Sequence, residues 1–183
     1  FDPKKDAVPV SEMLELDRWA LARVDALQDR ILELEQTYQF HLVTSLLMSF
    51  ATEDLGGFYL DVLKDRLYTT KADGLPRRSA QTALWHITAT LLRLMAPILS
   101  FTAEEAFAVF SPNESGTIFT ETNHMVPEVA NAPELLAKWE AVRSARAKVL
   151  KEIETLRAEG KIGSSLAADA IITASGSDWQ YLA

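Results

Sequence analysis

The sequence has no cysteine and little glycine or proline, and these shortages exclude several classes of protein. With 0 Cys in 183 residues, neither a disulfide framework nor a thiolate metal site can form. Only 7 Gly and 7 Pro exclude a collagen-like or low-complexity chain. No run approaches the roughly 20 apolar residues that a membrane span needs. The lack of cysteine fits a reducing compartment, and we expect a cytoplasmic protein without a membrane partner.

Catalytic motifs are also lacking. The three histidines, His41, His86 and His124, form no His-Glu-x-x-His zinc motif. Gly56-Gly57 is too short for a phosphate-binding loop, and the Gly-Ser-Ser at 163–165 is not a nucleophile elbow. We expect His41 and His86 to be partly buried and hydrogen-bonded, and His124 to lie in a loop without a partner. The sequence therefore predicts no active site, metal site or cofactor site within this chain.

What is present is the composition of a folded globular protein. The apolar fraction is 48%, the charged fraction is 24%, and the formal net charge is −8. This apolar content excludes a disordered chain, and the length favours one domain over two. The chain begins at Phe1 and stops at Ala183, soon after a new element starts. We therefore expect it to be a piece of a longer protein.

Most of the chain has the period of an α-helix. The clearest apolar stripe has spacings of three and four residues and predicts one long helix; it consists of Leu16, Ala20, Val24, Leu27, Ile31, Leu34 and Tyr38. Similar patterns predict helices over 39–55, 58–67, 79–96, 102–110 and 134–159.

Local signals predict where these helices start and stop. Ser11 is expected to cap the first helix, and Thr102 forms a capping box with Glu105. Gly56-Gly57 should weaken or kink the second helix, and Gly160 should end the last one in a left-handed conformation.

Two short segments have extended character. The run 168–173 is typical of a strand, although it has no partner strand in the chain, and a second short extended run is expected at 117–120. The predicted fold is all-α, an antiparallel helical bundle with a short C-terminal β-like remnant. We divide the chain into a helical domain, 1–160, and a junction with the start of a following segment, 161–183.

Charge is distributed unevenly along the chain. Residues 64–100 hold six Lys or Arg and two Asp, whereas residues 1–63 hold five basic and twelve acidic side chains. Residues 101–137 hold six Glu and no basic side chain. Basic groups pair with phosphates, and an aromatic ring among them can stack on an unpaired base. This pattern is compatible with an RNA-binding surface, but charge alone favours ordinary solvated helix faces.

Four ordered matches resemble one family. They are LDRWAL at 16–21, FYLDVLKDRLYT at 58–69, RRSAQTAL at 77–84 continuing to LMAPILSFTAEE at 94–105, and IGSSL at 162–166. Together they are similar to the C-terminal anticodon-binding domain of bacterial-type isoleucyl-tRNA synthetases, which are class I aminoacyl-tRNA synthetases. The stretch 58–69 is the most specific and argues against the valyl and leucyl relatives. Gly56-Gly57 stands where that family more often has Ser-Ala.

The resemblance implies a function for the chain. It implies a helical domain that binds the anticodon stem-loop of isoleucine tRNA. The parent enzyme would join isoleucine to that tRNA with ATP and Mg²⁺, using catalytic and editing domains of the same polypeptide. Many members also carry a cysteine-rich zinc segment. None of these parts is in this sequence, so we expect no catalysis from the chain itself, and we expect it to be monomeric.

Candidate RNA contacts follow from the charge pattern added to this resemblance. Lys64, Arg66, Lys71, Arg77 and Arg78 flank one helix–loop–helix junction and are expected to contact phosphates. Tyr68 is the candidate for stacking on a base, and Arg143 and Arg146 are second-tier candidates. Each residue has an alternative role, which for Arg66 is an internal ion pair with Asp61 or Asp65, and for Tyr68 is core packing. Trp19 and Trp139 are expected in the core.

Two other interpretations remain open at this stage. One is the same domain of a sister class I synthetase, most plausibly valyl. The other is a helical protein-interaction module without RNA, which the net charge of −8 and the apolar stripes would also allow.

Overall fold

The computed structural model describes residues 1–112, 116–164 and 167–173. All regular elements in these ranges are helices, and they contain no strand, so the predicted all-α class is confirmed. The chain divides into two compact units, Phe1–Ala130 and Asn131–Ala183, which are described one at a time.

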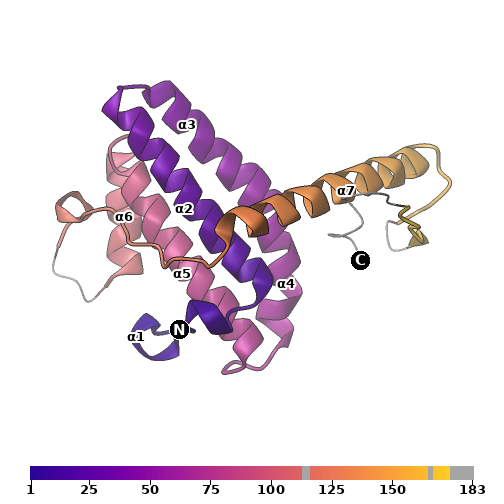
Figure 1. Ribbon diagram of the computed structural model, residues 1–183, viewed down its shortest axis with the longest axis horizontal. Coiled ribbons are helices and arrows are strands. Elements are labelled where there is room, and N and C mark those ends of the chain that lie inside the picture. Colours follow the sequence, from indigo (N-terminus) through magenta and orange to yellow (C-terminus); the bar gives the residue numbers. More distant parts are fainter. Residues whose placement is uncertain (113–115, 165–166, 174–183) are drawn as a thin grey trace. The chain divides into compact units, whose positions relative to one another are not determined.

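The first unit is a bundle of helices connected by short turns (Figure 1). Its elements are α1 (Pro3–Asp6), the 3₁₀ turn η1 (Val10–Glu12), α2 (Glu15–Gln36), α3 (Phe40–Ser49), the π-helix η2 (Phe50–Tyr59), α4 (Leu60–Thr69), α5 (Leu75–Met95), α6 (Ser100–Phe110) and the 3₁₀ turn η3 (Ile118–Thr120).

Helix α2 lies at the centre of this unit and packs against both α3 and α5 (Figure 1). Its buried residues include most of the stripe that the sequence predicts, from Ala20 to Leu34. Leu16 is only partly buried, and Tyr38 is exposed because α2 ends at Gln36 and the backbone turns there, with Tyr38 at a φ of 57°. The stripe therefore predicts the buried face of α2 correctly and extends two residues beyond the end of the helix.

Gly56-Gly57 does not break the helix in which it lies. Helices α3, η2 and α4 follow one another without a loop, and the backbone changes to the wider π geometry over Phe50–Tyr59. A Cβ at Gly57 would lie 3.1 Å from the carbonyl oxygen of Thr52, closer than ordinary van der Waals contact. The two glycines thus accommodate a change from α-helix to π-helix. Such π segments are rare in proteins and occur frequently at functional sites.

Both predicted helix caps are wrong. Helix α2 begins at Glu15, and Ser11 lies in the preceding turn η1. The amide of Leu14 donates instead to Ser79 Oγ, at 2.9 Å, on the distant helix α5. Helix α6 begins at Ser100, which places Thr102 inside the helix. In both cases contacts or turns outside the local motif decide the start of the helix.

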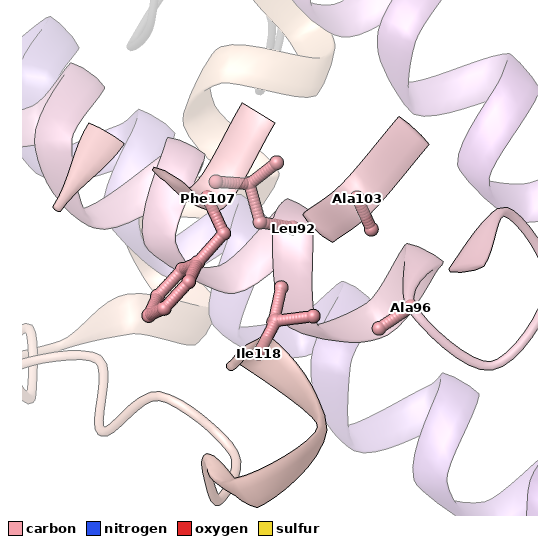
Figure 2. Close-up of a cluster of buried hydrophobic side chains, with 5 residues drawn as sticks. All are labelled: Leu92, Ala96, Ala103, Phe107 and Ile118. Carbon is pink, nitrogen blue, oxygen red and sulfur yellow. The ribbon is translucent and has the colours of Figure 1, made fainter. Parts of the chain in front are cut away.

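A buried apolar cluster joins α5, α6 and η3 (Figure 2). Leu92 comes from α5 and Ala96 directly follows that helix, Ala103 and Phe107 come from α6, and Ile118 comes from η3. The expected extended run at 117–120 is therefore a 3₁₀ turn. Glu104 holds this turn, because its Oε2 accepts the Ile118 amide at 2.9 Å.

The second unit contains the long helix α7 (Ala132–Ala158), close to the predicted 134–159. Gly160 follows with a φ of 71°, as expected for a left-handed helix stop. The expected strand at 168–173 is wrong, because no strand is present in the described residues 167–173. A strand needs a partner for its backbone hydrogen bonds, and Ile171 is 95% exposed. The proposed domain boundary after residue 160 remains a prediction.

Within the described residues, no helix has both the length and the apolar character required to span a membrane.

Candidate nucleic-acid interface

A fully buried carboxylate connects the helices that carry the candidate site. Asp17 has 0% exposure. Its Oδ1 accepts hydrogen bonds from Tyr59 Oη at 2.7 Å and from Arg66 Nη2 at 2.5 Å, and its Oδ2 accepts one from Ser79 Oγ. A buried charge is tolerated only when it is paired and hydrogen-bonded, and these three donors meet that requirement. We call Asp17, Tyr59, Arg66 and Ser79 the Asp17 network.

The network links four segments of the first unit. Asp17 belongs to the first turn of α2, Tyr59 ends η2, Arg66 lies in α4, and Ser79 lies near the start of α5. Burial, followed by the charge of Asp17, raises the pKa of Tyr59 well above 10. The phenol therefore stays protonated and remains a hydrogen-bond donor at all physiological pH values.

Three of the predicted RNA contacts are exposed near this network. Lys64 and Tyr68 lie on α4, four residues apart and therefore on one face of the helix. Tyr68 is 81% exposed, so its alternative role in the core is excluded. Lys71 lies in the loop between α4 and α5 and forms a 3.1 Å ion pair with Asp73. Both of these side chains are well exposed, so breaking the pair costs little.

The other predicted contacts in this unit are engaged with the protein. Arg66 forms the internal ion pair that the sequence allowed as its alternative role, and Asp17 is the partner that accepts from its guanidinium. Arg78 forms a 3.1 Å ion pair with Asp6, and Arg77 donates to the carbonyl of Thr70 at 3.4 Å. All three arginines are only partly exposed. The structure thus separates the predicted set into an exposed group and an anchored group.

The second-tier candidates lie in the other unit. Arg143 and Arg146 are partly exposed residues of α7, three positions apart on one face, and each has contacts with its surroundings. Trp139 is also on α7 and is partly buried. In the first unit, Trp19 is in the core as predicted, with its ring edge-on to Phe58 at 5.2 Å between centroids.

Sequence analysis did not identify the role of Asp17. Its position off the apolar stripe predicts a solvated side chain, and the structure buries it completely. A signal was present, because the network draws on three of the resembling stretches. Asp17 lies in 16–21, Tyr59 and Arg66 lie in 58–69, and Ser79 lies in 77–84. Residues that carry the resemblance therefore meet around one carboxylate.

A histidine pair holds the segment after η3 against α5. His86 Nδ1 lies 2.8 Å from His124 Nε2, so His124 has a partner that the sequence did not indicate. Burial lowers the pKa of His86 from 6.5 to about 4, and burial also lowers the pKa of His124. Nearby, Gln28 Nε2 donates to the carbonyl of His124 at 2.9 Å. His41 is exposed on α3, so the expectation that it is partly buried is wrong.

The described residues hold no group of three or more His, Cys, Asp or Glu side chains that could bind a metal ion.

Comparison with known proteins identifies the relatives of this chain. Residues 17–172 match the family described as the anticodon-binding domain of tRNA ligase. The whole chain is 55% identical to isoleucine–tRNA ligase from Janthinobacterium sp. (strain Marseille) and 56% identical to that from Paraburkholderia phytofirmans. Isoleucine–tRNA ligase from Aromatoleum aromaticum is 49% identical over the full chain.

The chain spans about a fifth of the length of these curated relatives, 19% of the first two and 20% of the third. The matched part is the anticodon-binding part of a tRNA ligase, in agreement with the expectation of a binding domain without catalytic machinery of its own. The resemblance seen in the sequence is confirmed, and the chain belongs to the anticodon-binding domain family of tRNA ligases.

Proposed function

We propose that this chain binds the anticodon stem-loop of isoleucine tRNA and positions that tRNA for aminoacylation by the rest of its ligase. Family membership supports binding of a tRNA anticodon region, and the names of the relatives support isoleucine tRNA. The observation that carries the proposal is the exposed group Lys64, Tyr68 and Lys71 in a chain of net charge −8.

In this proposal the three residues of the exposed group have different roles in binding. Lys64 and Lys71 pair with backbone phosphates and release counterions, which makes binding strongly dependent on salt. The ring of Tyr68 stacks on an unpaired anticodon-loop base. The acidic side chains of the first unit repel RNA elsewhere and favour approach to this face.

Titration of the full chain with isoleucine tRNA over a range of salt concentrations tests these roles. We expect Lys64→Glu or Lys71→Glu to weaken binding several-fold and to reduce the salt slope by about 1 each. Arg30→Glu is the matched control, since Arg30 is exposed and lies on α2 thirteen residues beyond Asp17, about 20 Å along the helix. Equal losses in all three variants would exclude a localised face.

The stacking role of Tyr68 has its own control. Tyr68→Ala should weaken binding by about 1–3 kcal/mol, while Tyr68→Phe retains the ring and should bind as the parent chain does. An RNA with a scrambled anticodon loop should bind more weakly. Equal affinity for both RNAs would contradict specific recognition of the loop.

For the whole ligase we propose ATP- and Mg²⁺-dependent attachment of isoleucine in the cytoplasm, with the catalytic and editing domains of the same polypeptide as partners. A zinc ion would be held by residues outside this sequence, since the chain has no cysteine. Aminoacylation by the full-length protein with isoleucine and with valine tests this, because preference for valine would show a sister synthetase. Light scattering of the 183-residue chain should show a monomer.

A further inference from the structure

The Asp17 network lies behind the exposed group on α4. In an α-helix, residues two apart point about 200° from one another. Arg66 lies two positions from both Lys64 and Tyr68, so its inward direction fixes their outward direction. Its side chain is only 16% exposed, and its Nη2 lies 2.5 Å from Asp17 Oδ1. This ion pair, together with the fully buried Leu63, therefore sets the rotation of α4 about its axis.

The same network fixes the other side of the junction. Ser79 donates to Asp17 from the second turn of α5, and Tyr59 donates from the residue that precedes α4. The loop 70–74, which carries Lys71, is thus held between two helices that share one acceptor. We call α4, this loop and the first two turns of α5 the α4–α5 hairpin.

We propose that Asp17 is a positioning residue for RNA binding, which sets the orientation of the α4–α5 hairpin so that Lys64, Tyr68 and Lys71 form one surface. Arg66 acts as part of the Asp17 network and does not contact phosphate. The inference rests on the proposed function, because it assigns a role in binding to a residue that RNA does not touch.

The alternative is that Asp17 only stabilises the fold. Asp17→Asn preserves the size of the side chain, but its amide nitrogen cannot accept the bond that Asp17 Oδ2 now receives, and its neutral group no longer balances Arg66. Destabilisation is therefore expected under both views. The two views differ in whether RNA affinity falls in chains that are still folded.

The test compares Asp17→Asn with a variant of equal stability in a different part of the unit. Ile118→Val and Ile118→Ala remove volume from the apolar cluster of α5, α6 and η3 in Figure 2, far from the hairpin in sequence. Urea unfolding identifies which of these matches Asp17→Asn. Binding of isoleucine tRNA is then measured at a temperature where every variant is folded. We expect a loss of about tenfold for Asp17→Asn and less than twofold for the matched control.

Salt dependence supplies a readout that a purely structural role does not change. A misoriented hairpin loses phosphate contacts, so the salt slope of Asp17→Asn should be shallower by 1–2, with the slope of the Ile118 control unchanged. If Asp17→Asn does not fold, Ser79→Ala replaces it, because this variant keeps the charge pair and removes one of the three donors to Asp17, together with the acceptor of the Leu14 amide. Ser79→Ala should lower affinity about threefold relative to its own Ile118 control.

The outcomes separate the two proposals. Suppose that the parent chain binds tRNA tightly, that Lys64→Glu weakens this binding, and that Asp17→Asn and its control bind equally well. This result would overturn the positioning role and leave the proposed function standing. No tRNA binding by the parent chain would overturn both.

Discussion

Arg66 reaches inward to Asp17, and the 2.5 Å between Nη2 and Oδ1 joins two residues that are 49 positions apart. The pair withdraws a cation from the surface of the basic segment that holds the candidate RNA contacts. It lies on the opposite side of α4 from the exposed Lys64 and Tyr68. In the proposed positioning role, Arg66 serves binding without facing the RNA.

Loss of Arg66 should therefore be costly for stability. Arg66→Met leaves the carboxylate of Asp17 buried without its charge partner, and we expect the free energy of unfolding to fall by about 3–5 kcal/mol. Urea denaturation followed by circular dichroism measures the change. Arg30→Met removes an exposed ion pair with Glu33 and should cost less than about 0.5 kcal/mol. A similar small loss for Arg66→Met would show that the buried pair contributes little.

The histidine pair should make stability depend on pH. Burial, followed by the neighbouring His124, lowers the pKa of His86 from its usual value of 6.5 to about 4, so folding favours the neutral ring. Its contribution is fully present above pH 6.5 and is lost as the pH falls towards 4. Arg93 and Glu121 form a 2.6 Å ion pair next to this segment, and Trp85 packs edge-on to His86.

The measurement is the free energy of unfolding between pH 7 and pH 4 for the parent chain and for His86→Gln. Carboxylates titrate in the same range, and the raised pKa values of Asp25 and Glu35 act with the opposite sign, so only the difference between the two proteins is informative. We expect the parent chain to lose more stability than the variant as the pH falls. Parallel curves would contradict a role for the pair.

The apolar cluster of α5, α6 and η3 should be sensitive to cavity formation. Phe107 is 2% exposed, and the guanidinium of Arg93 lies 5.6 Å from its ring centroid. Phe107→Ala should lower the free energy of unfolding by about 3–5 kcal/mol. Val109→Ala on the exposed side of the same helix, where Val109 is 81% exposed, should change it by less than about 0.5 kcal/mol. Urea unfolding of both variants gives the comparison.

Replacing Gly160 should destabilise the chain because of the backbone conformation at that position. Its φ is 71°, and a Cβ placed there would meet no atom within 4 Å. Gly160→Ala should therefore destabilise the end of α7 by about 1–2 kcal/mol through conformational strain alone. Hydrogen exchange of the last turns of α7 measures this, with Gly163→Ala as the control because that glycine has no positive φ and is equally uncrowded. Equal protection in both variants would remove the strain argument.

The apolar stripe of α2 could be predicted because its signal repeats along the whole helix. The stop of α7 at Gly160 could be predicted because glycine takes the left-handed conformation more readily than other residues. The caps at Ser11 and Thr102 failed because they are single local motifs, and tertiary contacts or a preceding turn outweighed them. The strand at 168–173 failed because its own residues supply no partner.

For the candidate site, the sequence by itself determined the helical elements, the basic segment and the family to which the chain belongs. Only the tertiary structure decided which of the basic side chains remain exposed. Lys64 and Arg66 are two residues apart with the same charge, yet one faces solvent and the other is paired with Asp17. The reason is that an ion pair depends on where a distant helix brings its carboxylate, and helical periodicity carries no information on that distance.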